Sequence, residues 1–312
     1  RYDAGYSPEF KNKDGYQGTL IHPQHWPEDI DYSDKKIIVI GSGATAVTLV
    51  PELAKKARHV TMIQRSPSYI LSLPNRDKIA YLLGKLLPKK WAYFLVRKKN
   101  ISRQLYLYQL TRSHPDKVRQ YIKKMAKKIL GGKVNVDRHF SPSYAPWDQR
   151  ICFIPDNDFY QAIASGNASV ITDEITCFTE TGIQLKSGRK EEADIIVSAT
   201  GFNLELLGGT QFIVDGQSID FSQTYTYKGM MFSSVPNMAS FFGYINASWT
   251  LHVDLIAEYV CRLINHMDNI EARQCTPQLR REDMDMPSRP WIDNFSSNYL
   301  QRAIHLFPKQ GS

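Results

Sequence analysis

The stretch that decides the fold is KIIVIGSGATAVTLVPELAKKARHVTMIQR, residues 36–65. It opens with an uninterrupted apolar run, residues 36–40, of the kind that forms a buried parallel strand. A glycine turn follows, and then residues 45–57 place apolar side chains at the spacing of one helix face. A second apolar run, residues 59–64, completes a strand–helix–strand unit long enough for a right-handed crossover. The sequence therefore predicts an α/β fold built on a parallel sheet.

The turn inside this unit has the form G-x-G-x-x-A and consists of Gly41, Ser42, Gly43, Ala44, Thr45 and Ala46. The first glycine permits a tight turn, the second lets the backbone approach a pyrophosphate, and the alanine lets the helix pack close to the strand. The N-terminus of the helix then offers free N–H groups to phosphates. Because the pattern lies between a strand and a helix, it predicts a dinucleotide site. A glycine turn in some other α/β fold is the structural alternative.

The end of the second strand indicates which nucleotide binds. In NAD-binding units, an acidic residue about 20 residues after the glycine turn binds the ribose 2′-hydroxyl. Here the strand runs into Arg65 and Ser66, with no acid. An arginine at this place can hold a 2′-phosphate through charge-assisted hydrogen bonds. We therefore predict that Arg65 and Ser66 select NADPH over NADH, the alternative being a surface arginine beside a turn proline.

An aromatic-rich loop with two histidines, YQGTLIHPQHWP at residues 16–27, precedes the unit. It resembles the fingerprint F-x-G-x-x-x-H-x-x-x-W-P of type I Baeyer–Villiger monooxygenases, which belong with the flavin-containing monooxygenases. The residues at the fingerprint positions are Tyr16 (in place of Phe), Gly18, His22, Trp26 and Pro27. Related N- or S-oxygenating enzymes usually carry Tyr or Phe at the position of Trp26, so the Trp-Pro pair favours the Baeyer–Villiger branch.

The resemblance extends over nearly the whole chain and is strongest to the ethionamide-activating branch in mycobacteria. It implies a flavoprotein with two dinucleotide-binding domains, a Rossmann-like one for NADPH and another for FAD. In this family NADPH reduces the flavin, which captures O2 as a peroxyflavin and inserts one oxygen atom into a ketone or oxygenates a thio compound. The fingerprint lies between the domains, so we expect His22 to couple and position them. A hydrogen-bonded loop histidine is the alternative.

The same resemblance suggests a catalytic arginine. The motif WDQR, residues 147–150, matches the place of the family's active-site arginine, which faces the flavin and the nicotinamide. A fixed cation at Arg150 would stabilise an anionic intermediate. Gln149 departs from the family's common lysine, which weakens any role of that position in binding the 2′-phosphate. The alternative for Arg150 is a structural ion pair with Asp148 or Asp156.

Two further segments are expected to contact cofactor. The apolar strand at residues 194–198 ends in small residues, among them Thr200 and Gly201, which permit close approach of a ligand. By resemblance, the chain leaves the NADPH domain here. Asn246 and Ala247 precede a helix whose N-terminus is expected near the flavin. An ordinary helix N-cap is the alternative at that place.

The expected organisation is a linker at residues 1–31, an NADPH domain at 32–201 with a helical insertion at about 76–147, and the C-terminal part of the FAD domain at 202–312. No second G-x-G-x-x-G occurs in the sequence. In the family that motif holds FAD near the N-terminus, so we expect this chain to be a fragment that is inactive alone. Its four cysteines form no C-x-x-C pair, which predicts reduced thiols and no metal site.

The net charge is +8, and residues 75–150 contain 19 Lys and Arg against four acids. Such a segment suits an anionic cofactor, nucleic acid or an anionic membrane surface, although a solvated helical face is the ordinary explanation. A non-catalytic basic module therefore stays open as an alternative to the enzyme. We expect no nucleic-acid partner, since no recognition motif accompanies the charge. No apolar run reaches bilayer length, so we expect a cytoplasmic protein with at most peripheral membrane contact.

Overall fold

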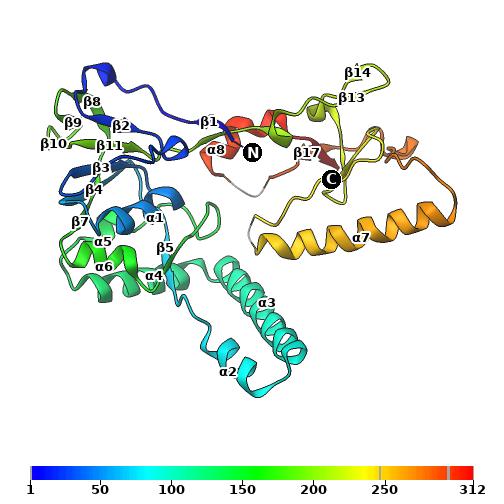
Figure 1. Ribbon diagram of the computed structural model, residues 1–312, viewed down its shortest axis with the longest axis horizontal. Helices are drawn as coiled ribbons and strands as arrows, with labels where there is room; N and C mark the ends of the chain where they lie inside the picture. The colour runs from blue at the N-terminus through cyan, green and yellow to red at the C-terminus, as the bar shows by residue number, and fades with distance from the viewer. Residues whose placement is uncertain (1, 246, 294–295, 312) are drawn as a thin grey trace. The chain divides into compact units, whose positions relative to one another are not determined.

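The computed structural model describes residues 2–245, 247–293 and 296–311 (Figure 1). The chain divides into two compact units, residues 4–202 and residues 203–312 with 1–3. The boundary falls inside two strands, β1 (Tyr2–Gly5) and β12 (Phe202–Leu204). The assignment of these units to an NADPH domain and an FAD domain stays a prediction.

A five-stranded sheet with every pairing parallel is the centre of the first unit. Its order is β2-β11-β3-β4-β7, formed by β2 (Thr19–Ile21), β11 (Ile195–Ser198), β3 (Lys36–Ile40), β4 (His59–Gln64) and β7 (Ala168–Thr172). Helix α1 (Ala44–Leu53) connects β3 to β4, as the strand–helix–strand pattern predicted. The helix ends four residues earlier than expected, at Leu53.

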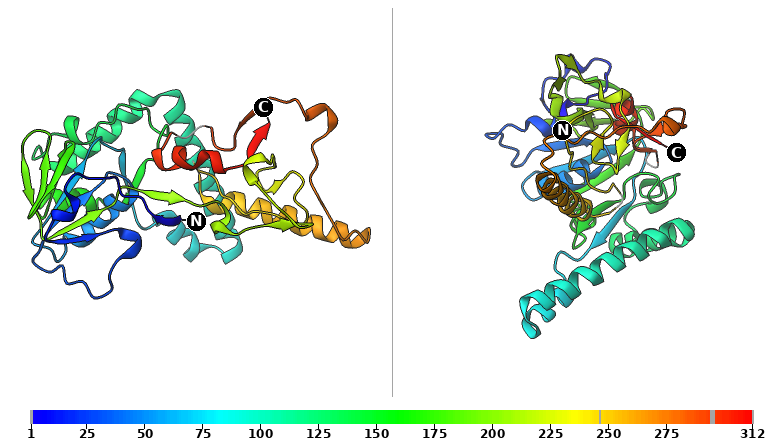
Figure 2. Two further views of the ribbon diagram at one scale, coloured as in Figure 1. Left: turned by 90° about the horizontal axis from the view of Figure 1, so that it is seen from above. Right: turned by 90° about the vertical axis from the view of Figure 1, so that its right-hand side faces the viewer.

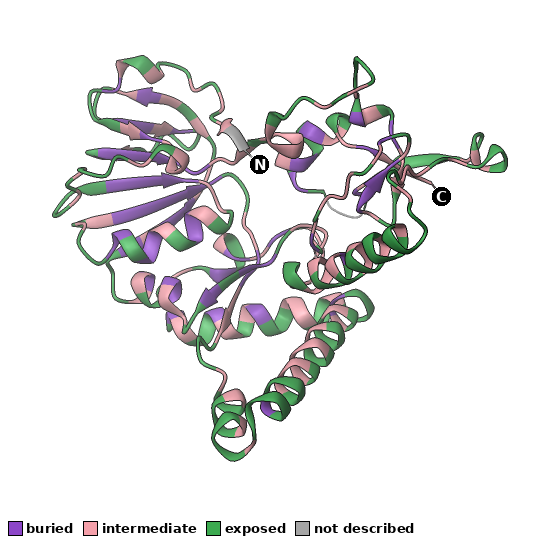
Figure 3. Ribbon diagram, turned by 45° about the vertical axis from the view of Figure 1, so that its right-hand side comes forward, coloured by how far each residue is buried: buried purple, intermediate pink, exposed green. Residues whose placement is uncertain are grey.

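Both faces of this sheet are covered, which explains why its strands read as continuous apolar runs. Ile37 and Val39 face one way and share a core cluster with residues of α1 and α6 (Asp158–Ala164). Ile38 and Ile40 face the other way and pack with residues of an antiparallel sheet. That sheet has the order β10-β9-β8 and consists of β8 (Ile175–Thr179), β9 (Gly182–Leu185) and β10 (Lys190–Glu192). The unit is thus three-layered, with the buried strands at its centre (Figure 3).

Helices occupy most of the segment between β4 and α6. They are α2 (Lys78–Leu86), α3 (Lys89–Ser113), α4 (Pro115–Leu130) and α5 (Val136–His139). Gly131 ends α4 with a φ of 59°, which is the left-handed C-terminal conformation expected of a glycine there. Figure 2 shows α2 and α3 extending away from the parallel sheet of the same unit.

Several short strands were not foreseen from the sequence, β1 among them. Residues 19–21, expected to be linker loop, form the edge strand β2, and β5 (Ile70–Leu73) pairs in parallel with β6 (Cys152–Pro155). Strands of three or four residues are too short to display a period, so pattern reasoning misses them. Within the segment expected to be a linker, residues 19–21 therefore belong to the sheet, while the linker role of residues 1–31 stays a prediction.

The second unit has one long helix and several short strand pairs. Helix α7 (Trp249–Asn269) covers the helix expected near residues 250–267, and α8 (Asn298–Ala303) follows later. The antiparallel pairs are β13 (Ile213–Val214) with β14 (Gln217–Ser218), β15 (Thr226–Tyr227) with β16 (Met231–Phe232), and β17 (Ser288–Pro290) with β18 (Lys309–Gly311). None of the helices in the described ranges combines the length and hydropathy of a bilayer-spanning segment.

Candidate dinucleotide site

The two glycines of the turn after β3 are required for different reasons. Gly41 has a φ of 137°, and a Cβ built on it would lie 2.3 Å from the carbonyl oxygen of Ala199, so the residue that follows β11 excludes a side chain. Gly43 has an ordinary φ of −80°, and a Cβ there would meet no protein atom within 4 Å. Packing therefore explains Gly41, whereas the open space at Gly43 suits the close approach of a ligand. Ala46 is fully buried beneath them.

The N-terminus of α1 lacks the usual side-chain cap. Gly43 is the N-cap residue and has no side chain to cap the helix, and the first turn, all of it within the described residues, contains no acid. The uncapped N–H groups and the positive end of the helix dipole favour an anion at this place. The residues present therefore fit the pyrophosphate of a dinucleotide, as the sequence motif predicted.

The loop after β4 is joined to the glycine turn by hydroxyl groups. The Ser42 hydroxyl donates to the carbonyl oxygen of Ser66 at 3.0 Å, and the Ser68 hydroxyl donates to the Ser42 oxygen at 3.0 Å. Arg65 is exposed at the same edge of the sheet, since β3 and β4 are parallel neighbours with Ile40 opposite Ile63. Across the described ranges no carboxylate forms an ion pair with Arg65. Its guanidinium is therefore available to an anionic ligand.

His22 links two distant parts of the first unit. Its Nδ1 accepts a hydrogen bond from the backbone N–H of Gln24, so its Nε2 carries the proton and donates to the carbonyl oxygen of Gly201 at 3.2 Å. Burial lowers the pKa of His22, although the bond to Gly201 opposes that effect. The ring also packs directly on the backbone at Gly5, where a Cβ would lie 2.1 Å from it. This geometry suits a positioning residue better than a base.

Residues 198–201 are hydrogen-bonded to the start of the unit. The Thr200 hydroxyl donates to the carbonyl oxygen of Tyr6 at 2.6 Å, and the Tyr6 N–H donates to the carbonyl oxygen of Gly201 at 3.0 Å. Gly201 has a φ of 117°, which favours glycine. Because the Thr200 proton is already donated within the protein, a cofactor contact at Thr200 would use its remaining acceptor capacity or its backbone.

The other fingerprint residues mostly serve packing. The Tyr16 hydroxyl is buried and donates to the carbonyl oxygen of Ala193 at 2.8 Å. A Cβ on Gly18 would lie 2.3 Å from that same hydroxyl, so glycine leaves room for Tyr16. Trp26 packs against the helix-side core and meets the Tyr32 ring edge-on at 6.5 Å. Pro27 is exposed.

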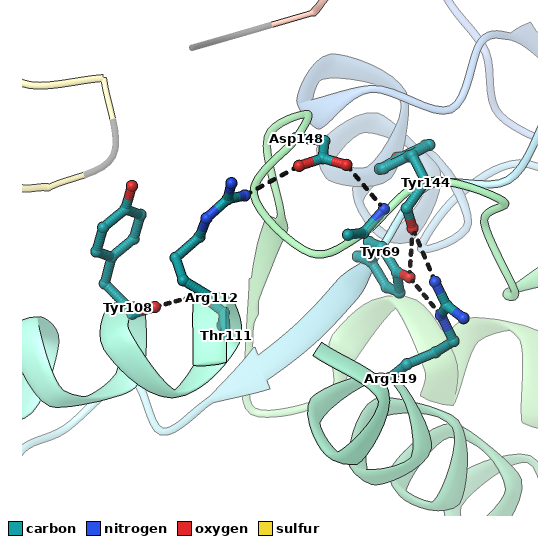
Figure 4. Close-up of polar contacts among 8 residues, drawn as sticks. Tyr69, Tyr108, Thr111, Arg112, Arg119, Tyr144 and Asp148 are labelled. Carbon is teal, nitrogen blue, oxygen red and sulfur yellow. Dashed lines mark hydrogen bonds and ion pairs between the residues drawn. The ribbon is translucent and has the colours of Figure 1, made fainter. Parts of the chain in front are cut away.

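Arg150 ends a tight turn just before β6. The Asp148 carboxylate accepts from the backbone N–H of Ala145 at 3.1 Å and from Nη1 of Arg112 in α3 at 2.9 Å (Figure 4). Asp156, the other carboxylate considered as a partner, accepts from the Asn75 N–H at 3.1 Å. In the part of the chain that the structure describes, Arg150 itself is exposed and forms no ion pair. The structural ion-pair alternative for Arg150 therefore gains no support.

A second anchor holds the other end of that turn. The Tyr69 hydroxyl donates to the carbonyl oxygen of Tyr144 at 2.8 Å, and Nε of Arg119 donates to the same hydroxyl at 3.0 Å (Figure 4). No local sequence pattern predicts these contacts, because Tyr69 and Tyr144 are 75 residues apart.

Strand β6 brings Arg150 close to the glycine turn. Cys152, two residues after Arg150, has its Sγ 4.0 Å from the carbonyl oxygen of Ser42. Burial raises the pKa of the Cys152 thiol to about 11, although the charge of Arg150 acts in the opposite direction. The thiol therefore stays protonated and serves packing, while its position puts the Arg150 turn beside the candidate dinucleotide site.

Of the pair expected near the flavin, Ala247 lies in the second unit just before α7, whose N-cap residue Ser248 makes no side-chain cap. Asn246 lies outside the described residues.

Comparison with known proteins decides the family. A family model described as flavin-binding monooxygenase-like matches residues 8–274. The chain belongs to this family. The recognition of a flavin-containing monooxygenase from the fingerprint is thereby confirmed.

Curated relatives of this family member are similar along its whole length. The FAD-containing monooxygenase EthA of Mycobacterium tuberculosis is 50% identical over 312 residues, which are 100% of the chain and 63% of EthA. The probable FAD-binding monooxygenase AlmA of Acinetobacter baylyi is 49% identical over 311 residues, which are 99% of the chain and 62% of AlmA. The chain thus spans somewhat less than two thirds of the length of these relatives.

Solved structures show the same fold at low identity. A steroid monooxygenase bound to NADP aligns with a TM-score of 0.64 at 20% identity, over 86% of this chain and 60% of that one. A cyclohexanone monooxygenase bound to ε-caprolactone aligns with a TM-score of 0.64 at 18% identity, over 89% and 63%. The predicted α/β flavoprotein fold is confirmed.

Proposed function

We propose that the full-length protein is an FAD-containing monooxygenase that uses NADPH and O2 to insert an oxygen atom into a ketone or to oxygenate a thio compound. The observation that carries the proposal is the combination of the open, uncapped turn at Gly43 with the exposed Arg65, in a chain of this family. The names of the relatives and the NADP bound to the steroid monooxygenase support both cofactors.

Each part of the site has a separate role in this proposal. The N–H groups after Gly43 bind the pyrophosphate of NADPH, and Arg65 with Ser66 binds its 2′-phosphate. Bound FAD supplies the oxygen-transfer chemistry. Arg150, which forms no ion pair within the described residues, supplies a cation that stabilises negative charge as it develops. His22 keeps the first and last segments of its unit together through Gly5 and Gly201.

The decisive experiment uses the purified full-length protein. The proposal expects a flavin absorbance spectrum with one FAD per chain, and O2-dependent oxidation of NADPH in preference to NADH. Protein that is folded yet carries no flavin and oxidises neither nucleotide would contradict the proposal and would favour the non-catalytic basic module.

A second assay separates the two oxygenation chemistries. The full-length protein is given a cyclic ketone and a thioether in parallel, and ester or lactone is measured against sulfoxide. The Trp26-Pro27 pair favours the ketone. Sulfoxide without any ester or lactone would assign the protein to the N- and S-oxygenating branch.

A further inference from the structure

The first two helices of the insertion, α2 and α3, expose many large apolar side chains. We define the hairpin tip as residues 78–98, which comprise α2 and the first part of α3. None of the α2 residues is buried, and only Ala92 and Thr111 are buried in the 25 residues of α3. The exposed large apolar residues of the tip are Ile79, Tyr81, Leu82, Leu86, Trp91, Tyr93, Phe94 and Leu95. The concentration of these side chains in one short segment, residues 78–98, indicates a binding partner.

The same segment is strongly basic. It contains no Asp or Glu, and its cations are Lys78, Lys85, Lys89, Lys90, Arg97 and Lys98. The acid beside it, Asp77, accepts from the Ala80 N–H at 3.1 Å and pairs with Lys99 at 2.5 Å. These contacts, the Lys99 hydrogen bond foremost, lower the pKa of Asp77 to about 2. Asp77 is therefore ionised and paired with Lys99, outside the tip. The tip therefore presents positive charge and apolar surface together.

This combination identifies the chemistry of the partner. Helices that lie in a membrane interface combine Lys and Arg with Trp, Tyr, Phe and Leu. Their aromatic rings lie at the level of the lipid headgroups, and their cations contact anionic lipid. Nucleic acid would satisfy the cations but would leave Ile79, Leu82 and Leu86 in water. Protein partners make little use of lysine at the centre of an interface.

The geometry of the tip suits shallow insertion. Leu86 and Trp91, which are 69% and 63% exposed, flank the turn at Pro88 where α2 passes into α3. Lys89 and Lys90 lie between them, and Lys85 stands over the Tyr81 ring at 4.5 Å. The burial colouring in Figure 3 shows α2 and most of α3 exposed. We propose that the hairpin tip docks the full-length protein on the surface of an anionic lipid bilayer, with Leu86 and Trp91 entering the headgroup–acyl boundary.

Vesicle sedimentation tests this docking, which is separate from the proposed oxygenation. The full-length protein is centrifuged with vesicles of phosphatidylcholine and with vesicles in which phosphatidylglycerol replaces about a third of it. We expect at least about tenfold tighter partitioning to the anionic vesicles. We expect the variants Leu86→Ser/Trp91→Ser and Lys89→Glu/Lys90→Glu each to lose about tenfold or more of it. All of these positions are exposed, so the variants should keep the melting temperature and the rate of NADPH oxidation in solution.

The matched control carries the same change of charge away from the tip. Lys11→Glu/Lys190→Glu alters two exposed lysines of the same unit and should bind vesicles like the parent protein. An acyl-brominated phosphatidylcholine in the anionic vesicles should quench tryptophan fluorescence, and Trp91→Phe should remove most of that quenching. The proposal is overturned if the parent protein stays in the supernatant. It is also overturned if the control weakens binding as much as Lys89→Glu/Lys90→Glu, or if Leu86→Ser/Trp91→Ser binds normally, because charge alone would then explain the attachment.

Discussion

Arg112 in α3 donates from Nη1 to Oδ1 of Asp148 at 2.9 Å and thereby joins the helical insertion to the turn that ends at Arg150 (Figure 4). The two side chains are 51% and 41% exposed, so the pair contributes only about 0–1 kcal/mol to the free energy of unfolding. We therefore expect its role to be positional, because it links the turn to α3.

This relationship predicts a specific effect of Asp148→Asn in the full-length enzyme. Asparagine keeps an acceptor for the Ala145 N–H but loses the charge that holds Arg112. We expect product formed per NADPH oxidised to fall several-fold, with little change in melting temperature. The matched control is Asp116→Asn, which removes the Arg119–Asp116 pair on α4 and should leave coupling intact. Unchanged coupling in Asp148→Asn would reduce the Arg112 pair to an ordinary surface contact.

Arg150→Ala should separate NADPH oxidation from oxygen transfer. If Arg150 stabilises negative charge during oxygen transfer, its loss should lower product formation on the order of 10²–10³-fold, while NADPH and O2 are still consumed. The missing oxygen should be recovered as hydrogen peroxide. Arg150→Lys should restore little, because a point charge does not reproduce the planar guanidinium. The measurement is coupling efficiency, and a tightly coupled alanine variant would mean that Arg150 has no catalytic role.

Arg65→Ala should weaken NADPH binding and spare NADH. The loss should amount to roughly 1–3 kcal/mol, the scale of a charged hydrogen bond. Titration of both nucleotides measures this directly. Arg58→Ala is the natural control, since Arg58 is exposed at the opposite end of the same strand, β4. Equal losses of affinity for NADPH and NADH in Arg65→Ala would show that Arg65 does not bind the 2′-phosphate.

The two glycines of the turn should respond in opposite ways to alanine. Gly41→Ala places a Cβ 2.3 Å from the Ala199 carbonyl oxygen at a φ of 137°. We therefore expect the free energy of unfolding to fall by on the order of 1–3 kcal/mol or more, with a clear drop in melting temperature. Gly43→Ala meets no protein atom within 4 Å, so the fold should tolerate it while NADPH binding weakens. A Gly43→Ala protein with normal NADPH affinity would argue against pyrophosphate binding at this turn.

His22 should make stability depend on pH in a defined direction. Burial lowers its pKa below the ordinary value of 6.5, so the folded state favours the neutral ring. The stabilisation is then present above about pH 6.5 and is lost as the pH falls towards the lowered pKa, because protonation favours unfolding. His22→Gln can still donate to Gly201 but does not titrate. We expect its melting temperature to fall less steeply below pH 6.5 than that of the parent protein.

The pH dependence of the parent protein alone would not isolate His22, because burial lowers the pKa of His139 as well. The comparison with His22→Gln is therefore needed. That contribution is common to the parent and to His22→Gln, so the difference between their profiles reports His22 alone. Identical profiles would mean that His22 does not contribute through its protonation.

Local patterns explain what the sequence could predict. The strand–turn–helix around Gly41 and the C-terminal glycine of α4 are short-range signals, and both are present in the structure. The partners of the candidate site residues are not short-range. His22 meets Gly201 at a separation of 179 residues, and Arg112 meets Asp148 at 36, so no window of sequence contains both members of either pair. The strand β2 was missed because three residues show no period. The roles of Arg65 and Arg150 stay predictions.

The hydrogen bond from the Tyr6 N–H to Gly201 has a consequence for modularity. The backbone nitrogen of Tyr6 lies 3.0 Å from the carbonyl oxygen of Gly201, although 195 positions separate the two residues along the chain. The two ends of residues 4–202 are therefore adjacent. A module whose ends meet can be inserted into a host domain, or exchanged between hosts, without displacing the host's own termini. The first unit therefore has the form of a cassette, which a protein engineer could cut at Ala4 and Phe202 and replace as a whole.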